Sequence, residues 1–186
     1  IYNVKSKSVT TSKGGTAIEN YYYPTSGSIP DLSDLSSAQQ SMISTLLNHN
    51  RLTTLLEKRT FRDSVPVNST LYGYRDWGNS IYAIEQVYVH SGTNPFESRL
   101  HYHTYDSKGH VTSVSKENDA KQIYLWGYNG QYPVAKIVGS DYATVNAVIS
   151  QSQIDNAINS SMIQSASDQA LRTALSILRT DSRTKN

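Results

Sequence analysis

The chain has 186 residues, with 17 Lys and Arg against 15 Asp and Glu, a formal net charge of +2. It contains no cysteine, which excludes disulfides, thiolate catalysis and cysteine-ligated metal sites. No apolar run approaches the roughly 18 residues of a membrane-spanning helix, and no basic stripe predicts binding to nucleic acid. The length favours a single domain over 1–186. Ile, Val, Leu and Phe supply only 40 residues, so the 14 tyrosines must help to fill its core.

The chain opens with a lead segment, residues 1–30, whose turn lies at Gly14-Gly15. The sequence predicts β-like pieces at Asn3–Thr11 and Thr16–Tyr23, on either side of that turn. Polar and apolar side chains alternate only weakly over most of this segment. The prediction of two β-like pieces therefore depends mainly on the turn at the glycines.

A helix is predicted within 33–50, with its clearest part from Ser36 to Asn48. Ser36 and Gln39 have the spacing of a capping box, in which each side chain satisfies a backbone N–H group of the other residue. One face of this helix carries apolar side chains at a 3.6-residue repeat: Leu35, Ala38, Met42, Ile43, Leu46 and Leu47. We therefore expect Leu46 and Leu47 to be buried against a sheet.

The region 52–139 is rich in β-forming residues separated by turn residues. Strands are predicted near 53–62, 67–76, 80–90, 98–106, 110–117, 122–128 and 132–138. Most of the connections are too short for a crossover helix, so the strands should pair as an antiparallel meander.

Residues 140–180 are predicted to be helical, because apolar side chains recur there at helical spacing, and 181–186 form a polar tail that we expect to fray. The sequence thus predicts an α+β fold. Its antiparallel sheet should carry one helix from the N-terminal half and the C-terminal helices packed on it.

Two tyrosine-plus-turn units stand out within the β region. In the first, Tyr105 and Asp106 begin a turn that ends at Gly109, where a positive φ would close a bulge. The second unit follows at a spacing of about 20–25 residues, a period that is typical of β-repeat arrays. The residues that we expect to shape both units are Tyr105, Asp106, Gly109, Trp126, Gly127, Tyr128, Asn129, Tyr132 and Pro133.

The stretches His103–Val111 and Tyr124–Ile137 closely resemble the RHS/YD-repeat proteins of Bacteroidetes, and the resemblance extends over roughly Ile29 to Leu178. It implies that the sheet is built of YD-repeat hairpins, and that the chain is a structural scaffold segment of a long exported or cell-surface protein. Neighbouring repeats, or self-association through a β-edge, would then be its partners. It implies no catalytic residues, because the motif serves folding.

Two further observations bear on the parent protein and on catalysis. The chain starts at Ile1 without a signal-peptide pattern, so we expect it to be cut from a longer precursor, with an extracytoplasmic location. It contains no nucleophile-elbow, zinc-protease or phosphate-loop motif, so we expect no enzyme and no cofactor.

Three histidines offer a weak candidate metal site. If Asp106–Gly109 is the turn, His103 lies opposite Thr112, and His101, His103 and His110 share one face of the hairpin. Three imidazoles on one face can bind Zn²⁺. Because these histidines are not directly opposed and lack a carboxylate at ligand spacing, we expect no metal here.

An alternative function uses the aromatic side chains. Tyr74, Trp77, Tyr82 and Trp126 could stack on sugar rings and bind a carbohydrate or another cell-surface ligand, with polar side chains nearby for hydrogen bonds. The exposure of Trp77 and Trp126 distinguishes this alternative from a scaffold, because stacking requires open ring faces.

Overall fold

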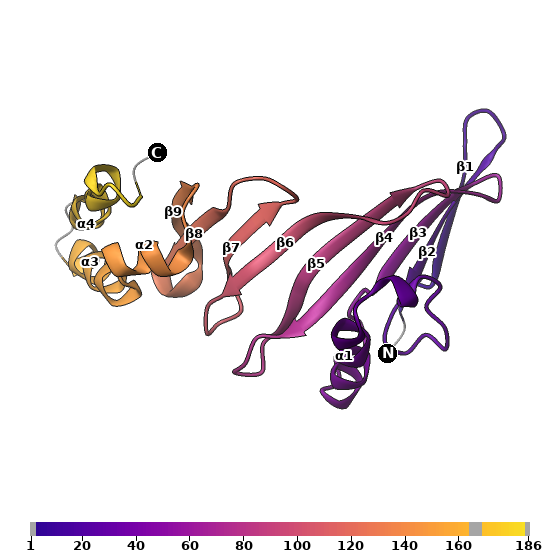
Figure 1. Ribbon diagram of the computed structural model, residues 1–186, viewed down its shortest axis with the longest axis horizontal. Coiled ribbons are helices and arrows are strands. Elements are labelled where there is room, and N and C mark those ends of the chain that lie inside the picture. The colour runs from indigo at the N-terminus through magenta and orange to yellow at the C-terminus, as the bar shows by residue number, and fades with distance from the viewer. Residues whose placement is uncertain (1–2, 164–168, 185–186) are drawn as a thin grey trace. The chain divides into compact units, whose positions relative to one another are not determined.

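The computed structural model describes residues 3–163 and 169–184. Its nine strands form one antiparallel sheet whose order follows the chain from β1 to β9 (Figure 1). Together with four α-helices they confirm the predicted α+β class. No helix within the described ranges is long and apolar enough to cross a membrane.

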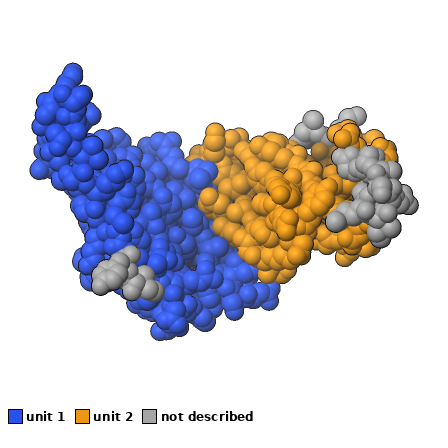
Figure 2. Space-filling model, turned by 180° about the vertical axis from the view of Figure 1, so that it is seen from behind, with its two compact units in different colours: residues 1–101 blue, residues 102–186 orange. Residues whose placement is uncertain are grey.

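The chain divides into two compact units, residues 1–101 and 102–186 (Figure 2). The division falls inside β6 (Glu97–Tyr105). The first contains β1 (Ser6–Thr10), β2 (Thr16–Tyr22), η1 (Leu32–Asp34), α1 (Ser37–Asn48), β3 (Glu57–Arg62), β4 (Val65–Asp76), β5 (Tyr82–Ser91) and the start of β6 (Glu97–Tyr105). The second contains β7 (Val111–Lys116), β8 (Gln122–Gly127), η2 (Tyr128–Gly130), β9 (Tyr132–Val138), α2 (Tyr142–Val148), α3 (Gln151–Ile163) and α4 (Gln169–Thr180). A single domain over 1–186 stays a prediction.

Helix α1 in unit 1 begins at the predicted capping box. The Ser36 hydroxyl accepts a bond from the Gln39 backbone N–H at 3.3 Å, and the Gln39 side chain accepts one from the Ser36 N–H at 3.2 Å. Leu46 is fully buried, but Leu47 is 37% exposed, so its predicted burial is wrong. Consecutive helical residues are separated by about 100°, and only Leu46 lies at the centre of the apolar face.

Tyrosines complete a small apolar core in unit 1. Its buried members are Ile29, Leu46 and Leu56, so the loop before η1, helix α1 and the residue before β3 meet there. Tyr74 and Tyr82 pack against this cluster from β4 and β5. The low content of aliphatic residues is thus offset by rings whose hydroxyls remain available for hydrogen bonds.

Unit 2 contains the larger apolar core. Side chains of β8 alternate, and Ile123 and Leu125 on one face are buried. Together with Ile137 of β9 they pack against side chains from all three C-terminal helices: Val145, Val148, Ile149, Ile154, Ile158, Leu171 and Leu178. The predicted packing of the helices on the sheet is confirmed in this unit.

Residues 181–184, after the end of α4, make hydrogen bonds within unit 2. Thr184 is buried, and its hydroxyl donates to the Leu178 carbonyl at 2.8 Å. The Ser140 hydroxyl donates to the Arg183 carbonyl at 3.3 Å. These bonds satisfy carbonyls at and after the end of α4, and the expected fraying of 181–186 stays a prediction. Residues 185–186 lie outside the described ranges.

Candidate functional site

The turn between β6 and β7 in unit 2 is organised by one carboxylate. Asp106 Oδ1 accepts bonds from the backbone N–H groups of Lys108 and His110, each at 2.9 Å. Its Oδ2 lies 2.8 Å from Nδ1 of His110. Gly109 has a φ of 85°, the positive value expected for the turn. Burial acts to raise the pKa of Asp106, but the hydrogen bonds from His110 and Lys108 outweigh it and leave the pKa lowered.

A second turn, at η2, meets the first. The Lys108 ammonium donates to the backbone carbonyl of Asn129 at 3.0 Å and also to its side-chain oxygen. The His110 ring stacks on Trp126, with ring centroids 4.7 Å apart. Gly130 also lies against this ring, and an added Cβ there would overlap the imidazole. The two turns therefore interlock through a hydrogen-bonded imidazole, an ammonium and an indole.

The other residues predicted to shape these units lie around the interlock. A side chain at Gly127 would collide with Val134, so the backbone of β8 lies close to its neighbours. The Tyr105 ring stacks with that of Tyr102 at 6.0 Å. Tyr128 contacts Tyr132 edge to face, while Tyr132 and Pro133 are themselves exposed at the start of β9.

The expected shared face for three histidines is wrong. The Thr104 and Thr112 hydroxyls lie 2.7 Å apart, whereas His103 bonds to the Ser115 hydroxyl at 3.0 Å. Side chains alternate along a strand, so Thr104 and His103 point to opposite faces, and Thr112, which was predicted opposite His103, lies opposite Thr104 instead. His110, two residues before Thr112, is therefore on the other face from His101 and His103. A shift of one residue moves a side chain to the other face of the sheet.

Each histidine consequently has its own neighbours. The His101 ring bonds to Gln86 at 3.1 Å and to Ser98 at 2.9 Å, all within unit 1. His110 pairs with Asp106 in unit 2. Among the residues that the structure describes, no group of three or more His, Asp or Glu side chains is placed to hold a metal ion.

The aromatic candidates of unit 1 are half-buried and contact neighbouring side chains or backbone. The Tyr74 hydroxyl donates to a backbone carbonyl at 2.9 Å, and its ring faces the core. The Tyr82 hydroxyl lies 2.9 Å from Nε2 of His49, whose ring packs against it at 4.5 Å. Trp77 is half-buried, with the guanidinium of Arg75 4.9 Å from its ring centroid.

Trp126, the aromatic candidate of unit 2, is also half-buried and carries His110 on its ring. Its indole N–H donates to the Val111 carbonyl at 2.8 Å. Tyr74 and Tyr82 thus pack on one apolar cluster of unit 1, Trp77 lies against Arg75, and Trp126 lies against His110 in unit 2. Their arrangement offers little support for a common sugar-stacking surface.

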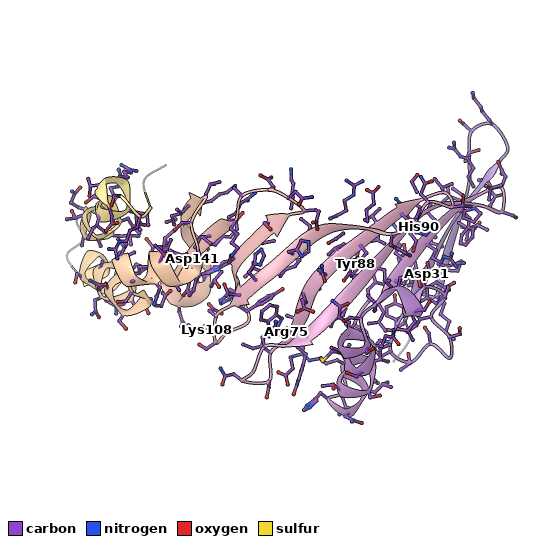
Figure 3. The ribbon with its side chains drawn as sticks, viewed as in Figure 1. Asp31, Arg75, Tyr88, His90, Lys108 and Asp141 are labelled. Atoms are coloured by element: carbon purple, nitrogen blue, oxygen red, sulfur yellow. The ribbon has the colours of Figure 1, made fainter. Side chains whose placement is uncertain are left out.

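A polar cluster inside unit 1 was not predicted. Glu57, at the start of β3, is fully buried and accepts a bond from the Ser69 hydroxyl at 3.0 Å and from the Asp31 N–H at 3.2 Å. Arg59 Nε lies 3.3 Å from Glu57, and its Nη2 lies 3.6 Å from the Asp31 carboxylate. His90 Nε2 of β5 approaches the same carboxylate to 3.9 Å (Figure 3).

Burial raises the pKa of Glu57 to about 7, and the nearby Asp31 carboxyl adds to the rise. Two atoms of the cluster, Asp31 Oδ2 and His90 Nε2, are buried without a hydrogen-bond partner among the described residues. Such a group of titratable side chains responds to pH, because a proton on Glu57 removes a buried negative charge.

One sequence signal could have indicated this cluster. Glu57 directly follows Leu55 and Leu56 within the strand predicted near 53–62, where a charged residue next to apolar ones suggests a buried carboxylate. Its partners come from three other segments of the chain, and pairing of β3, β4 and β5 is needed to bring them together.

A second buried polar network joins α1 to β5. The amide of Gln39, itself 3% exposed, donates to Glu85 at 3.0 Å and to Gln86 at 3.3 Å. The Tyr88 hydroxyl donates to Gln39 at 3.3 Å and to Gln86 at 2.6 Å. A Cβ at Gly73 of β4 would overlap the Gln39 amide, so glycine is required for this close approach.

No family model, curated protein or solved structure matches this chain. In the described residues, the carboxylates and imidazoles mainly form contacts with neighbouring turns and strands. They satisfy backbone N–H groups, stack on rings and pair with one another.

Proposed function

We propose that this chain is a structural scaffold segment of a longer exported or cell-surface protein of the RHS/YD-repeat type, without catalysis of its own. The resemblance over residues 103–137 supports this proposal. The interlock of Asp106, His110 and Trp126 supports it as well, because these conspicuous polar and aromatic groups serve to hold two turns together.

The observation that carries the proposal is the open edge of β1, since a scaffold segment needs a surface that joins further strands. The Thr11 N–H donates to the Gly15 carbonyl at 2.7 Å, and the Tyr21 N–H donates to the Lys5 carbonyl at 2.9 Å. These two bonds determine which residues of β1 direct their backbone groups towards β2. By alternation, the N–H and C=O of Ser8 point away from β2. All five residues of β1 are exposed, and an edge of this kind accepts another strand.

Sedimentation velocity over a wide range of protein concentration tests this role. We expect the chain to self-associate, and Ser8→Pro to reduce that association because it removes an outward N–H group. Ser8→Ala is the matched control, which keeps the N–H and should associate like the unmodified chain. A monomer at every concentration that also binds a defined oligosaccharide on a glycan array would overturn the proposal in favour of surface-ligand binding.

A further inference from the structure

A cavity of about 520 Å³ lies within unit 2, where the turn η2 meets helix α3. Its volume is in the range of sites that bind a small molecule or a single side chain. The described residues that line it come in equal number from the turn and from the helix: Tyr128, Asn129, Gln131, Asp155, Ile158 and Asn159.

The aromatic residue of the turn is held in a strained backbone conformation. Tyr128, Asn129 and Gly130 have φ values of 51°, 58° and 86°. Asparagine and glycine adopt positive φ readily, whereas a bulky tyrosine there is an outlier. The Tyr128 side chain is nevertheless 36% exposed, and its edge-to-face contact with Tyr132 covers one ring face at most. Strain at an exposed ring points to a function for that ring outside the packing of unit 2.

A carboxylate without an ionic partner lies across the cavity on α3. Asp155 is half-buried, and its Oδ1 accepts a bond from the Gln151 amide at 3.0 Å. It forms no ion pair within the part of the chain that the structure describes, and the other described residues that line the cavity are uncharged. Partial burial of an unpaired carboxylate costs free energy, so the cavity favours a positively charged ligand.

Two amides add hydrogen-bond acceptors beside this carboxylate. The side chains of Gln131 and Asn159 are exposed, and neither makes a hydrogen bond with another described residue. Asn129 differs, because its side-chain oxygen already accepts a bond from the Lys108 ammonium. The oxygens that remain available to a ligand are therefore those of Asp155, Gln131 and Asn159.

This combination suits a guanidinium group. A guanidinium is planar, stacks on an aromatic ring and donates several hydrogen bonds to carboxylate and amide oxygens. The methylene chain that carries it packs well on an apolar side chain such as Ile158. We propose that the cavity between η2 and α3 binds a guanidinium on an aliphatic chain, either as free arginine or as an arginine side chain of a partner protein. This site goes beyond the scaffold role, which depends on the β1 edge.

Titration of the full chain with N-acetyl-arginine amide, followed through backbone amide shifts, tests the proposal. We expect saturable binding that weakens with salt, with shifts confined to η2 and α3. N-acetyl-citrulline amide has nearly the same shape without the charge and should bind about fivefold more weakly or less. N-acetyl-lysine amide carries the same charge on a compact ammonium, which lacks the planar fork, so its affinity should lie between the two.

Two pairs of variants separate the charge from the ring. Asp155→Asn should weaken binding of the arginine amide by about fivefold, whereas Asp119→Asn, which removes the same charge from unit 2 outside the cavity, should leave it unchanged. Tyr128→Leu should weaken binding by about two- to fivefold, because it removes the stacking face. Tyr128→Phe keeps the ring and should bind like the unmodified chain.

Tyr128→Asn distinguishes a ring displayed for a ligand from a ring that stabilises unit 2. Asparagine tolerates a φ of 51°, so this variant should unfold at a higher urea concentration, measured at the Trp126 indole signal, while its binding of the arginine amide weakens. Unfolding at a lower urea concentration would show that the ring serves packing, and the proposal would be wrong.

Equal binding of the arginine and citrulline amides, amide shifts elsewhere in the chain, or no binding at millimolar ligand would overturn the proposal. Tighter binding of methyl glucoside than of the arginine amide would do the same and would identify a sugar site. Free arginine separates the two sources: tighter binding than that of the amide indicates a small molecule, and weaker binding indicates a side chain of a partner protein. None of these outcomes alters the test of β1, in which Ser8 is the substituted residue.

Discussion

The two units are stabilised in different ways although they share one chain and one kind of strand pairing. Unit 2 is stabilised mainly by aliphatic packing, with β8, β9 and three helices around one apolar core. Unit 1 has a smaller apolar cluster and buries the carboxyl of Glu57 and the amide of Gln39, whereas the buried polar residues of unit 2 carry only hydroxyls: Thr112, Ser113, Ser115 and Thr184. The stability of a polar interior falls when any single hydrogen-bond partner is lost, whereas the stability of an apolar core depends on the side-chain volume that is removed.

The difference means that the units should respond to different perturbations. The chain has two tryptophans, Trp77 in unit 1 and Trp126 in unit 2, so the two indole N–H signals report on the units separately. Each experiment below compares these two signals during unfolding.

The largest effect is expected from truncation of the helix α1 side chain at the centre of the unit 1 core. Leu46→Ala should lower the unfolding free energy of unit 1 by about 2–5 kcal/mol, because the side chain is fully buried and leaves a cavity. Urea titration followed at the Trp77 signal measures the loss. Leu47→Ala, one position along and 37% exposed, is the matched control and should cost less than about 0.5 kcal/mol. Similar costs for both variants would contradict the packing of α1.

A pH titration should produce the next largest effect, again in unit 1. The pKa of Glu57 is raised from 4.5 to about 7, so the folded state holds a proton that the unfolded state releases between these values. This proton stabilises the folded state by on the order of 1–3 kcal/mol. The stabilisation is fully present below pH 4.5 and is lost as the pH rises through 7. The charged and titratable groups that face Glu57 are Asp31, Arg59 and His90.

Glu57→Gln isolates this contribution. The amide keeps an acceptor for Ser69 but does not titrate, so the Trp77 transition of the variant should vary less with pH than that of the unmodified chain. The same slope in both proteins between pH 4.5 and 7 would show that another group is responsible. The Trp126 transition serves as the internal reference, because unit 2 lies outside this cluster.

The smallest of the three effects concerns the turn in unit 2. Gly109→Val should destabilise unit 2 by about 1–2 kcal/mol, since a β-branched residue is strained at a φ of 85°. Gly109→Asn should cost less, because asparagine adopts left-handed backbone more readily. Chemical denaturation read at the Trp126 signal distinguishes the two variants. No loss in the valine variant would mean that the turn rearranges without strain.

The sequence was informative wherever structure is determined locally. The seven strands predicted between 52 and 139 are all present, because turn residues separate short runs of β-forming residues. The capping box at Ser36 was predictable for the same reason, as its two residues lie within one helical turn. Burial of Leu46 followed from helical periodicity, but which of two adjacent leucines is central depends on how the helix is rotated on the sheet.

Long-range partners were not predictable from the residues alone. Asp31, Glu57, Ser69 and His90 come from separate segments, and only the observed strand pairing brings them together. The histidine prediction failed for a related reason. A turn of the expected residues can be closed in two registers that differ by one position, and the bonds of Thr104 and His103 select the register that places His110 on the other face from His101 and His103.

The double role of Gln39 matters to anyone who would engineer this chain. A glutamate at this position is as good a capping-box residue as glutamine, so a design based on helix sequence alone would accept Gln39→Glu. In the folded protein the Gln39 amide donates to Glu85 at 3.0 Å, and a carboxylate there would remove the donor and bring two negative charges together. The helix cap alone would accept either glutamine or glutamate at position 39, but the hydrogen bond to Glu85 of β5 requires the amide.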